Sequence, residues 1–358
     1  MKKRISCLLL CLLLIWSLCG CVKTVQLNER AIVEAIGIDY QNGAYVVTLR
    51  LLDPNEPDAE GFLSVSEGET ILDAIDHANR KQGREIFYNH NNLLVVGQQA
   101  AETGLTYLTG LMDAAGHARP NTSVVLARGK ASEVIAVSAK EGLSAKELDT
   151  AIENEEKSGA VLKAYLIDVA KRLNDGSGSF LLPTVSANED SLMLDGAGLV
   201  KSGKLAGFLN TDDLRGYLWL AGNLEDAVFT ANDEEYGNFT LAIKNSKGEI
   251  VPTLQDGKLG FSMKVTVKAH IPILKNGEEI AQDRAKQQKL MATAELAIQN
   301  ELLHTLDLFQ KKNADVFRLE ERLSQRYPKE QEERRKVEGP TVFQLPTKIT
   351  VSVHFIGL

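Results

Sequence analysis

Strict alternation of apolar and polar residues marks two segments in the second half of the chain. In residues 261–269 every second residue is apolar, and serine, threonine or lysine stands between. Residues 349–355 repeat the pattern, and the apolar positions of the two segments are Phe261, Met263, Val265, Val267 and Ala269, then Ile349, Val351, Val353 and Phe355. A period of two is that of a half-buried β-strand. Both segments are therefore predicted to be antiparallel strands with one face on the core.

A long helix is predicted between these strands, over about residues 279–310. Its apolar residues recur every three or four positions and so share one helical face; they are Met291, Ala294, Ile298, Leu302, Leu306 and Phe309. A second helix over residues 314–326 is predicted to stop at Pro328. The charged run from Lys329 to Glu338 is interpreted as a solvated helix end.

The first half of the chain mixes short strands with helices. Asn42-Gly43 between two apolar runs is a strong hairpin signal. Thr70 with Asp73 three residues later is typical of a helix start, and an apolar stripe follows, formed by Ile71, Leu72, Ile75 and Ala78. Further helices are predicted over about 100–115, 132–137 and 161–173, and strands over 85–88, 93–97, 122–127 and 180–182.

Together these elements predict an α+β, multi-domain protein with mixed or antiparallel sheets and a long C-terminal helix packed on a sheet. The length of 358 residues fits two or three domains. The polar stretch 187–190 is the preferred boundary. We therefore divide the chain into residues 1–20, an N-terminal α+β region over 21–187 with room for two subdomains, and a C-terminal α+β domain over 188–358.

The first twenty residues have the three parts of a secretory signal peptide. Residues 2–4 are basic, an apolar run follows over residues 7–16, and small residues close the segment. The apolar run is shorter than the roughly 20 residues that span a bilayer. The segment ends in Leu18-Cys19-Gly20-Cys21, which resembles a lipobox. This pattern predicts cleavage before Cys21 and attachment of lipid to its sulfur.

Cysteine positions and net charge limit the partners of the mature body. All four cysteines lie at or before position 21, so the body has no thiols for an internal disulfide or a thiolate metal site. The formal charge is −8, and removal of residues 1–20 leaves 37 basic and 48 acidic residues, a charge of −11. An acidic body is repelled by nucleic acid and by anionic lipid. We therefore predict no nucleic-acid partner, and attachment to the lipid bilayer through the acyl chains on Cys21.

No catalytic, cofactor or metal motif stands out. The six histidines show no HExxH or paired metal spacing; they are His77, His90, His117, His270, His304 and His354. The serines of Gly176-Ser177-Gly178-Ser179 are out of step with a nucleophile elbow, and Gly196-Ala197-Gly198 lacks the third glycine of a dinucleotide site. The acidic loop 53–61 has Pro57 where a calcium ligand belongs. We therefore predict no catalytic residues, no cofactor and no metal.

Three blocks of residues, taken in order, carry a resemblance to a known family. They are the lipobox with residues 26–33 and 36–39; residues 196–201 and 204–209; and residues 310–312, 314–317 and 326–329 with a final strand that ends at Gly357. Residues 84–90 and 95–97 fit the same pattern. The blocks together resemble the Ger(x)C family of spore germination lipoproteins. Two features depart from the family pattern. The family often has aromatic and acidic residues where this chain has Val22-Lys23, and a tryptophan where it has Phe343.

This resemblance implies a non-catalytic lipoprotein subunit of a nutrient germinant receptor, needed for spore germination. The implied partners are integral membrane receptor subunits, and the implied location is the outer face of the cytoplasmic membrane or the inner membrane of the spore. The implied fold is α+β with about three domains. Two other classes stay open: a solute-binding lipoprotein of a transporter, which usually has parallel sheets built from alternating strands and helices, and an enzyme that acts on the cell wall.

Overall fold

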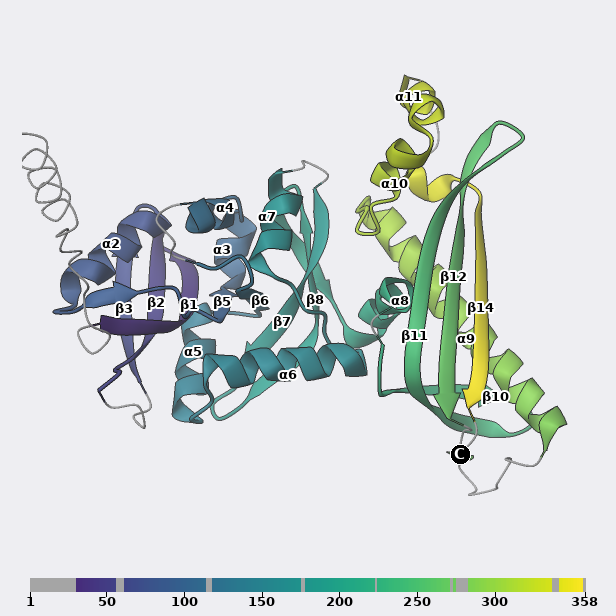
Figure 1. The fold of residues 1–358 in the computed structure, drawn as a ribbon, viewed down its shortest axis with the longest axis horizontal. Helices are drawn as coiled ribbons and strands as arrows, with labels where there is room; N and C mark the ends of the chain where they lie inside the picture. The colour runs from purple at the N-terminus through teal and green to yellow at the C-terminus, as the bar shows by residue number, and fades with distance from the viewer. Residues whose placement is uncertain are drawn as a thin grey trace, which may run out of the picture.

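The computed structural model describes residues 30–55, 61–113, 118–174, 178–222, 224–270, 273–274, 283–336 and 341–356. They form two β-sheets, and Figure 1 shows these side by side with helix α8 (Thr211–Ala221) between them. Cys21, His117 and most of the acidic loop lie outside the described residues. None of the helices in these ranges combines the length and the apolar composition that crossing a membrane requires.

The first sheet has nine strands and a parallel centre. Its order is β3-β2-β1-β5-β6-β7-β8-β9, with β4 also paired to β1. Strands β1, β5, β6 and β7 run parallel, while β2–β3 and β8–β9 extend the two ends in antiparallel fashion. The strands are β1 (Arg30–Gln41), β2 (Ala44–Leu52), β3 (Phe62–Gly68), β4 (Glu85–Phe87), β5 (Leu93–Val96), β6 (Ser123–Ala127), β7 (Ser179–Ala187), β8 (Leu192–Lys201) and β9 (Lys204–Leu209).

Helices cover both faces of this sheet because its central strands are apolar on both sides. One core joins Ile36 and Ile38 of β1 to helices α2, α3, α4 and α7. A separate core on the other face joins Ala35 and Val95 to helices α5 and α6. The helices are α2 (Ile71–Lys81), α3 (Gln98–Thr103), α4 (Tyr107–Asp113), α5 (Ala131–Lys140), α6 (Ala145–Ser158) and α7 (Leu166–Asn174).

The second sheet has five strands, in the order β10-β11-β12-β14 with β13 beside β11. Helix α9 packs on one face through the apolar stripe expected from its sequence. This arrangement confirms the α+β class, the mixed strand orientation and the long C-terminal helix on a sheet. The elements are β10 (Ala227–Asp233), β11 (Gly237–Gln255), β12 (Lys258–His270), β13 (Ile273–Leu274), α9 (Arg284–Lys312), α10 (Leu319–Arg326), α11 (Pro328–Lys336), the 3-10 turn η2 (Val342–Gln344) and β14 (Thr347–Ile356).

The last strand, β14, pairs with β12 in parallel, and the prediction that it is antiparallel was wrong. Its alternation is as predicted, with Val353 buried and His354 exposed. The direction follows from the connection, because α9 lies between β12 and β14 in the chain and carries it back across the sheet. Alternation reports which face of a strand is buried, and it contains no information on the direction of the neighbour.

Local signals agree with several element boundaries. The hairpin between β1 and β2 turns at Asn42 and Gly43, which both have positive φ, as this turn requires. The hydroxyl of Thr70 accepts a hydrogen bond from the N–H of Asp73 at 3.1 Å and caps α2. The apolar stripe of this helix faces the core except at Leu72, which is 44% exposed.

Three predicted helices have other limits in the structure. The helix expected over 100–115 is broken at Gly104, whose φ is 143°. The helix expected over 161–173 begins only at Leu166. The second C-terminal helix begins at Leu319, because Asn313 and Arg318 adopt left-handed backbone conformations that interrupt helical hydrogen bonding. The charged run beyond it forms a helix of its own, α11.

The boundary predicted at residues 187–190 lies between β7 and β8, which pair within one sheet. The core of the second sheet also includes Leu181, Leu199 and Leu209 from the first sheet. The two sheets therefore share apolar packing across this region. The division into residues 21–187 and 188–358 stays a prediction.

Candidate interaction site between the two sheets

The first block, residues 36–39, fixes helix α5 on the first sheet. The carboxylate of Asp39 accepts hydrogen bonds from the backbone N–H groups of Ala131 at 2.7 Å and Ser132 at 2.9 Å. A carboxylate at a helix N-terminus satisfies otherwise unpaired N–H groups and interacts favourably with the helix dipole. A Cβ on Gly37 would lie 2.7 Å from Cδ1 of Ile135 and 3.4 Å from Cβ of Ala131, so a larger residue would require the Ile135 side chain to move. This part of the block is therefore structural.

The second block forms the hairpin of β8 and β9. Gly196 has a φ of 70°, and a Cβ there would lie 2.1 Å from the carbonyl oxygen of Leu209. The guanidinium of Arg128 donates to that carbonyl oxygen at 3.0 Å and lies 4.5 Å from the ring centre of Phe208. Arg128 was not predicted from the sequence, since a single arginine between two loops carries no motif. It links the segment that follows β6 to both strands of this hairpin.

A lysine at the tip of this hairpin contacts the end of helix α9, which packs on the second sheet. Lys201 Nζ donates a hydrogen bond to the carbonyl oxygen of Lys312 at 3.1 Å. Lys312 is the last residue of α9, where carbonyl groups have no helical partner and a cation is favourable. The second and third blocks therefore meet at this contact.

The third block forms the turn between α9 and α10. The carboxylate of Asp315 accepts hydrogen bonds from the N–H groups of Leu319 at 2.8 Å and Glu320 at 2.9 Å, and so caps α10. Burial raises the pKa of the Asp315 carboxyl, although these two hydrogen bonds act in the opposite direction. Phe317 stacks on Tyr217 of α8 with ring centres 5.3 Å apart. The turn is thus joined to the helix between the two sheets.

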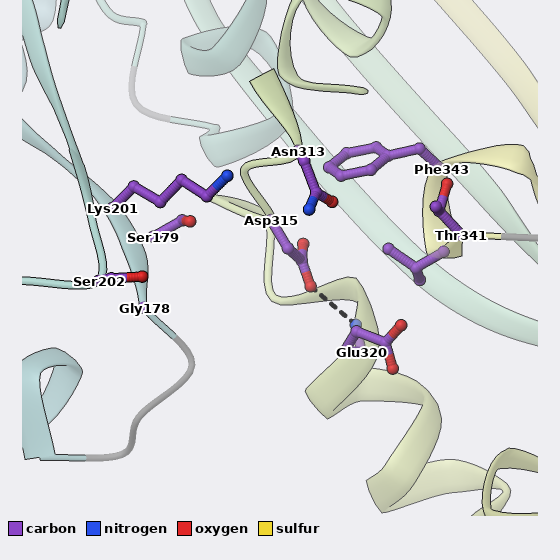
Figure 2. A pocket seen from close by; sticks show the side chains of 10 residues that line it. Gly178, Ser179, Lys201, Ser202, Asn313, Asp315, Glu320, Thr341 and Phe343 are labelled. Atoms are coloured by element: carbon purple, nitrogen blue, oxygen red, sulfur yellow. Dashed lines mark hydrogen bonds between the residues drawn. The ribbon is translucent and has the colours of Figure 1, made fainter. Parts of the chain in front are cut away.

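The two blocks enclose a pocket of about 300 Å³. Figure 2 shows Lys201 and Ser179 on the strand side, Phe343 and Thr341 on the opposite side, and Asp315 between them. The full lining is Gly178, Ser179, Lys201, Ser202, Asn313, Asp315, Glu320, Thr341, Val342 and Phe343. Phe343, which departs from the family pattern, therefore lies at the same site as the two blocks.

Three charged groups of this pocket are already engaged within the protein. Lys201 binds the end of α9, and Asp315 caps α10. Glu320 forms ion pairs with Arg334 and, at 3.3 Å, with Arg335. These contacts hold the surrounding turns in place, and they do not pair a nucleophile with a base. The geometry is that of a hydrogen-bonded junction or contact surface between the two sheets.

None of the described histidines lines this pocket. His77 Nδ1 lies 2.7 Å from the carbonyl oxygen of Glu67, and His304 Nε2 lies 3.1 Å from Asp213. Within the described ranges no group of three or more histidine, cysteine, aspartate or glutamate side chains could hold a metal ion.

Two residues of the pocket, Glu320 and Thr341, were not predicted as site residues from the sequence. Thr341 and Gln344 form a capping box, and their spacing could have identified Thr341 in the sequence.

Replacing Lys201 with methionine is expected to lower the free energy of unfolding by about 1 kcal/mol, because the hydrogen bond and the charge at the end of α9 are lost. For a unit of 150–250 residues this corresponds to a melting temperature lower by roughly 2–4 °C. Thermal unfolding followed by circular dichroism measures the shift. Lys204→Met is the matched control, since Lys204 is exposed on the same hairpin. Equal melting temperatures for the two variants would contradict a role for the Lys201 contact.

Comparison with known families and structures places these blocks in context. The family model described as "Spore germination protein N-terminal domain" matches residues 23–187, and that described as "Spore germination B3/ GerAC like, C-terminal" matches residues 195–356. Spore germination protein KC of Bacillus subtilis (strain 168) is 25% identical, with 91% of this chain and 89% of that protein covered. Spore germination protein B3 of the same organism is 23% identical, with 82% of each chain covered.

The fold is also shared with a solved structure. The crystal structure of the GerBC protein superimposes with a TM-score of 0.59 at 20% sequence identity, and covers 90% of this chain and 96% of that one. At this identity the likeness concerns the fold, and the two family models, which together span most of the sequence, define the relationship. The chain therefore belongs to the Ger(x)C family of spore germination proteins.

Proposed function

We propose that this protein is a lipid-anchored, non-catalytic subunit of a nutrient germinant receptor. The observation that carries the proposal is the match of both family models, which leaves few residues of the body unmatched. The lipobox-like sequence ending at Cys21 supplies the anchor. Two acyl chains hold a protein at a bilayer stably, whereas one binds only marginally.

The proposed mechanism is transmission of a signal by contact. Helices of the described ranges are not suited to cross a membrane, so the signal would pass to integral membrane receptor subunits. Anchoring confines both partners to one thin layer and raises their effective concentration. The junction around Lys201 and Asp315 suits this role, because it joins two sheets through fixed hydrogen bonds.

Replacing Cys21 with alanine tests the anchor. We expect the variant to lose incorporation of radioactive fatty acid and to fail to restore the nutrient response of spores that lack the gene. The same spores should still germinate with agents that bypass nutrient receptors. Restoration of the response by the unlabelled variant would show that the anchor is dispensable.

A second set of measurements separates this proposal from its two alternatives. Calorimetric titration with amino acids and sugars should give no micromolar binding to this protein alone, and such binding would favour a solute-binding lipoprotein. Incubation with peptidoglycan should release no fragments, and release would favour a wall enzyme. Loss of bypass germination in spores without the gene would point to a general role in the wall or in permeability.

A further inference from the structure

In the part of the chain that the structure describes, no helix packs on one face of the second sheet. Helices α8 and α9 pack on the same side of it, since Gly248 lies against α8 and the apolar side chains of β12 lie against α9. Figure 1 shows α9 behind strands β11, β12 and β14, with the opposite face turned toward the viewer. The residues of this open face are those that alternate with the buried ones, and most of them are exposed. An antiparallel sheet commonly exposes one face to solvent, so an open face alone does not indicate a function. The residues on the face decide whether it has a further role.

The composition of the open face is basic and rich in hydroxyl groups. Strand register places Lys247 beside Thr266, Lys264 beside Thr350, and Lys268 beside His354. Across the central strands the face consists of Asn245, Lys247, Glu249 and Val251 of β11, Ser262, Lys264, Thr266, Lys268 and His270 of β12, and Lys348, Thr350, Ser352 and His354 of β14. We name this set the basic face.

The lysines of the basic face outnumber the carboxylates beside them. Lys247, Lys264, Lys268 and Lys348 form no ion pair with any residue in the described part of the chain. Glu249 is the one acidic residue among the members of the face, and it lies opposite Lys264 in the register. The chain as a whole has 48 acidic and 40 basic residues. A local excess of positive charge on an acidic protein is therefore produced by the fold.

At one end of the basic face the surface is hollowed. This hollow has a volume of about 650 Å³ and includes Lys348 and Ser262 of the face together with Lys258. Hydroxyls of Thr253 and Thr347 and the carboxylate of Asp256 also line it. Lysine ammonium groups and hydroxyls are donors that bind phosphate oxygens.

We propose that the basic face docks on the surface of a membrane that contains anionic lipids. The charge complementarity supports this occupant, as does the shape, because a sheet face presents its lysines over a broad area instead of in a deep cleft. Each lysine near such a surface strengthens binding about fivefold at moderate ionic strength. The inference goes beyond the proposed anchor at Cys21, since it sets the orientation of an anchored protein on the bilayer.

Lysine acetylation of the full, membrane-bound protein tests the proposal. The protein is reconstituted in vesicles of phosphatidylcholine alone or with phosphatidylglycerol, and the rate of acetylation of each lysine is measured by mass spectrometry. We expect Lys247, Lys264, Lys268 and Lys348 to react at least fivefold more slowly on the anionic vesicles. Lys146 and Lys171, which are exposed on the first sheet's helices, should react at similar rates on both. High salt should remove the protection, since exposed charges are screened.

A pair of charge variants sharpens the test. Lys264→Gln with Lys268→Gln should remove most of the protection of Lys247 and Lys348, because losing both lysines weakens binding to the anionic surface by about 25-fold if the two act independently. Lys146→Gln with Lys171→Gln removes the same charge elsewhere and should leave the protection unchanged. Equal rates for all lysines on both kinds of vesicle would overturn the proposal. Protection that needs other spore membrane proteins and not anionic lipid would also overturn it, in favour of an acidic protein partner.

The same samples report on the anchor separately. The mass of the peptide that contains Cys21 shows whether lipid is attached. A missing lipid would count against the proposed function. The acetylation rates of the protein that is still bound to vesicles would nevertheless test the basic face. A lipidated peptide without lysine protection would count against the basic face alone.

Discussion

Replacing Glu34 with alanine is expected to lower the free energy of unfolding by about 3–5 kcal/mol, because it leaves a buried charge without its partner. Glu34 in β1 and Arg50 in β2 form an ion pair at 3.1 Å, with side chains 7% and 4% exposed. The other carboxylate oxygen of Glu34 accepts a hydrogen bond from the N–H of Ala145 at 2.9 Å, at the start of α6. The guanidinium of Arg50 donates to Ser138 of α5 at 3.0 Å. The ion pair therefore joins two strands and two helices.

Urea unfolding followed by far-ultraviolet circular dichroism measures this loss. The double variant Glu34→Leu with Arg50→Met is the control, since removal of both charges avoids an unpaired ion and commonly recovers most of the stability. A single variant within about 1 kcal/mol of the parent would show that Arg50 finds another partner or water. A double variant as unstable as the single one would assign the loss to packing and not to charge.

Replacing Trp219 with alanine is expected to lower the free energy of unfolding by about 3–5 kcal/mol, the usual range for a buried large aromatic residue. Trp219 lies in α8 and is fully buried. Its ring meets Phe229 edge-on with centres 5.6 Å apart, and its Nε1 donates to Glu301 of α9 at 2.9 Å. Arg215 also pairs with this glutamate. Loss of the indole would leave a cavity between α8, α9 and the second sheet.

Graded variants separate the cavity from the hydrogen bond. Trp219→Phe keeps an aromatic ring and loses the donor, so a smaller loss of about 1–2 kcal/mol is expected. Val228→Ala on β10 serves as the surface control, because Val228 is 63% exposed and its change should stay within about 0.5 kcal/mol. Trp219→Ala as stable as Val228→Ala would contradict the packing described here.

Periodicity and turn chemistry determined much of the local structure. The alternation in residues 261–269, the stripe of α9 and the turn at Asn42 and Gly43 all operate over a few neighbouring residues. Such signals act through the backbone's own geometry, so they can be interpreted without knowing the rest of the fold. The lipobox-like sequence ending at Cys21 is of the same kind, and its role stays a prediction.

Two helices, α6 and α8, were not predicted from the sequence. In helix α6 the buried residues Ala145, Leu148 and Ile152 form only a narrow apolar stripe among many acidic residues. Its capping box at Ser144 and Glu147 and the left-handed Gly159 at its end were the available signals. Helix α8 is apolar on more than one side because it lies between two sheets, and its pattern therefore lacks a clear period.

The tertiary structure alone decided which distant residues meet. The parallel pairing of β14 with β12 depends on the path of α9 across the sheet. The contact of Lys201 with Lys312 joins positions 111 residues apart. The basic face gathers lysines that are scattered from Lys247 to Lys348 in a chain whose net charge is negative. The sequence by itself determined the family through its ordered blocks, and it determined the buried faces of β12 and β14 and the cap of α2 at Thr70 through local spacing. Strand order, helix crossing and charge segregation came only from the fold, because they depend on which segments lie side by side.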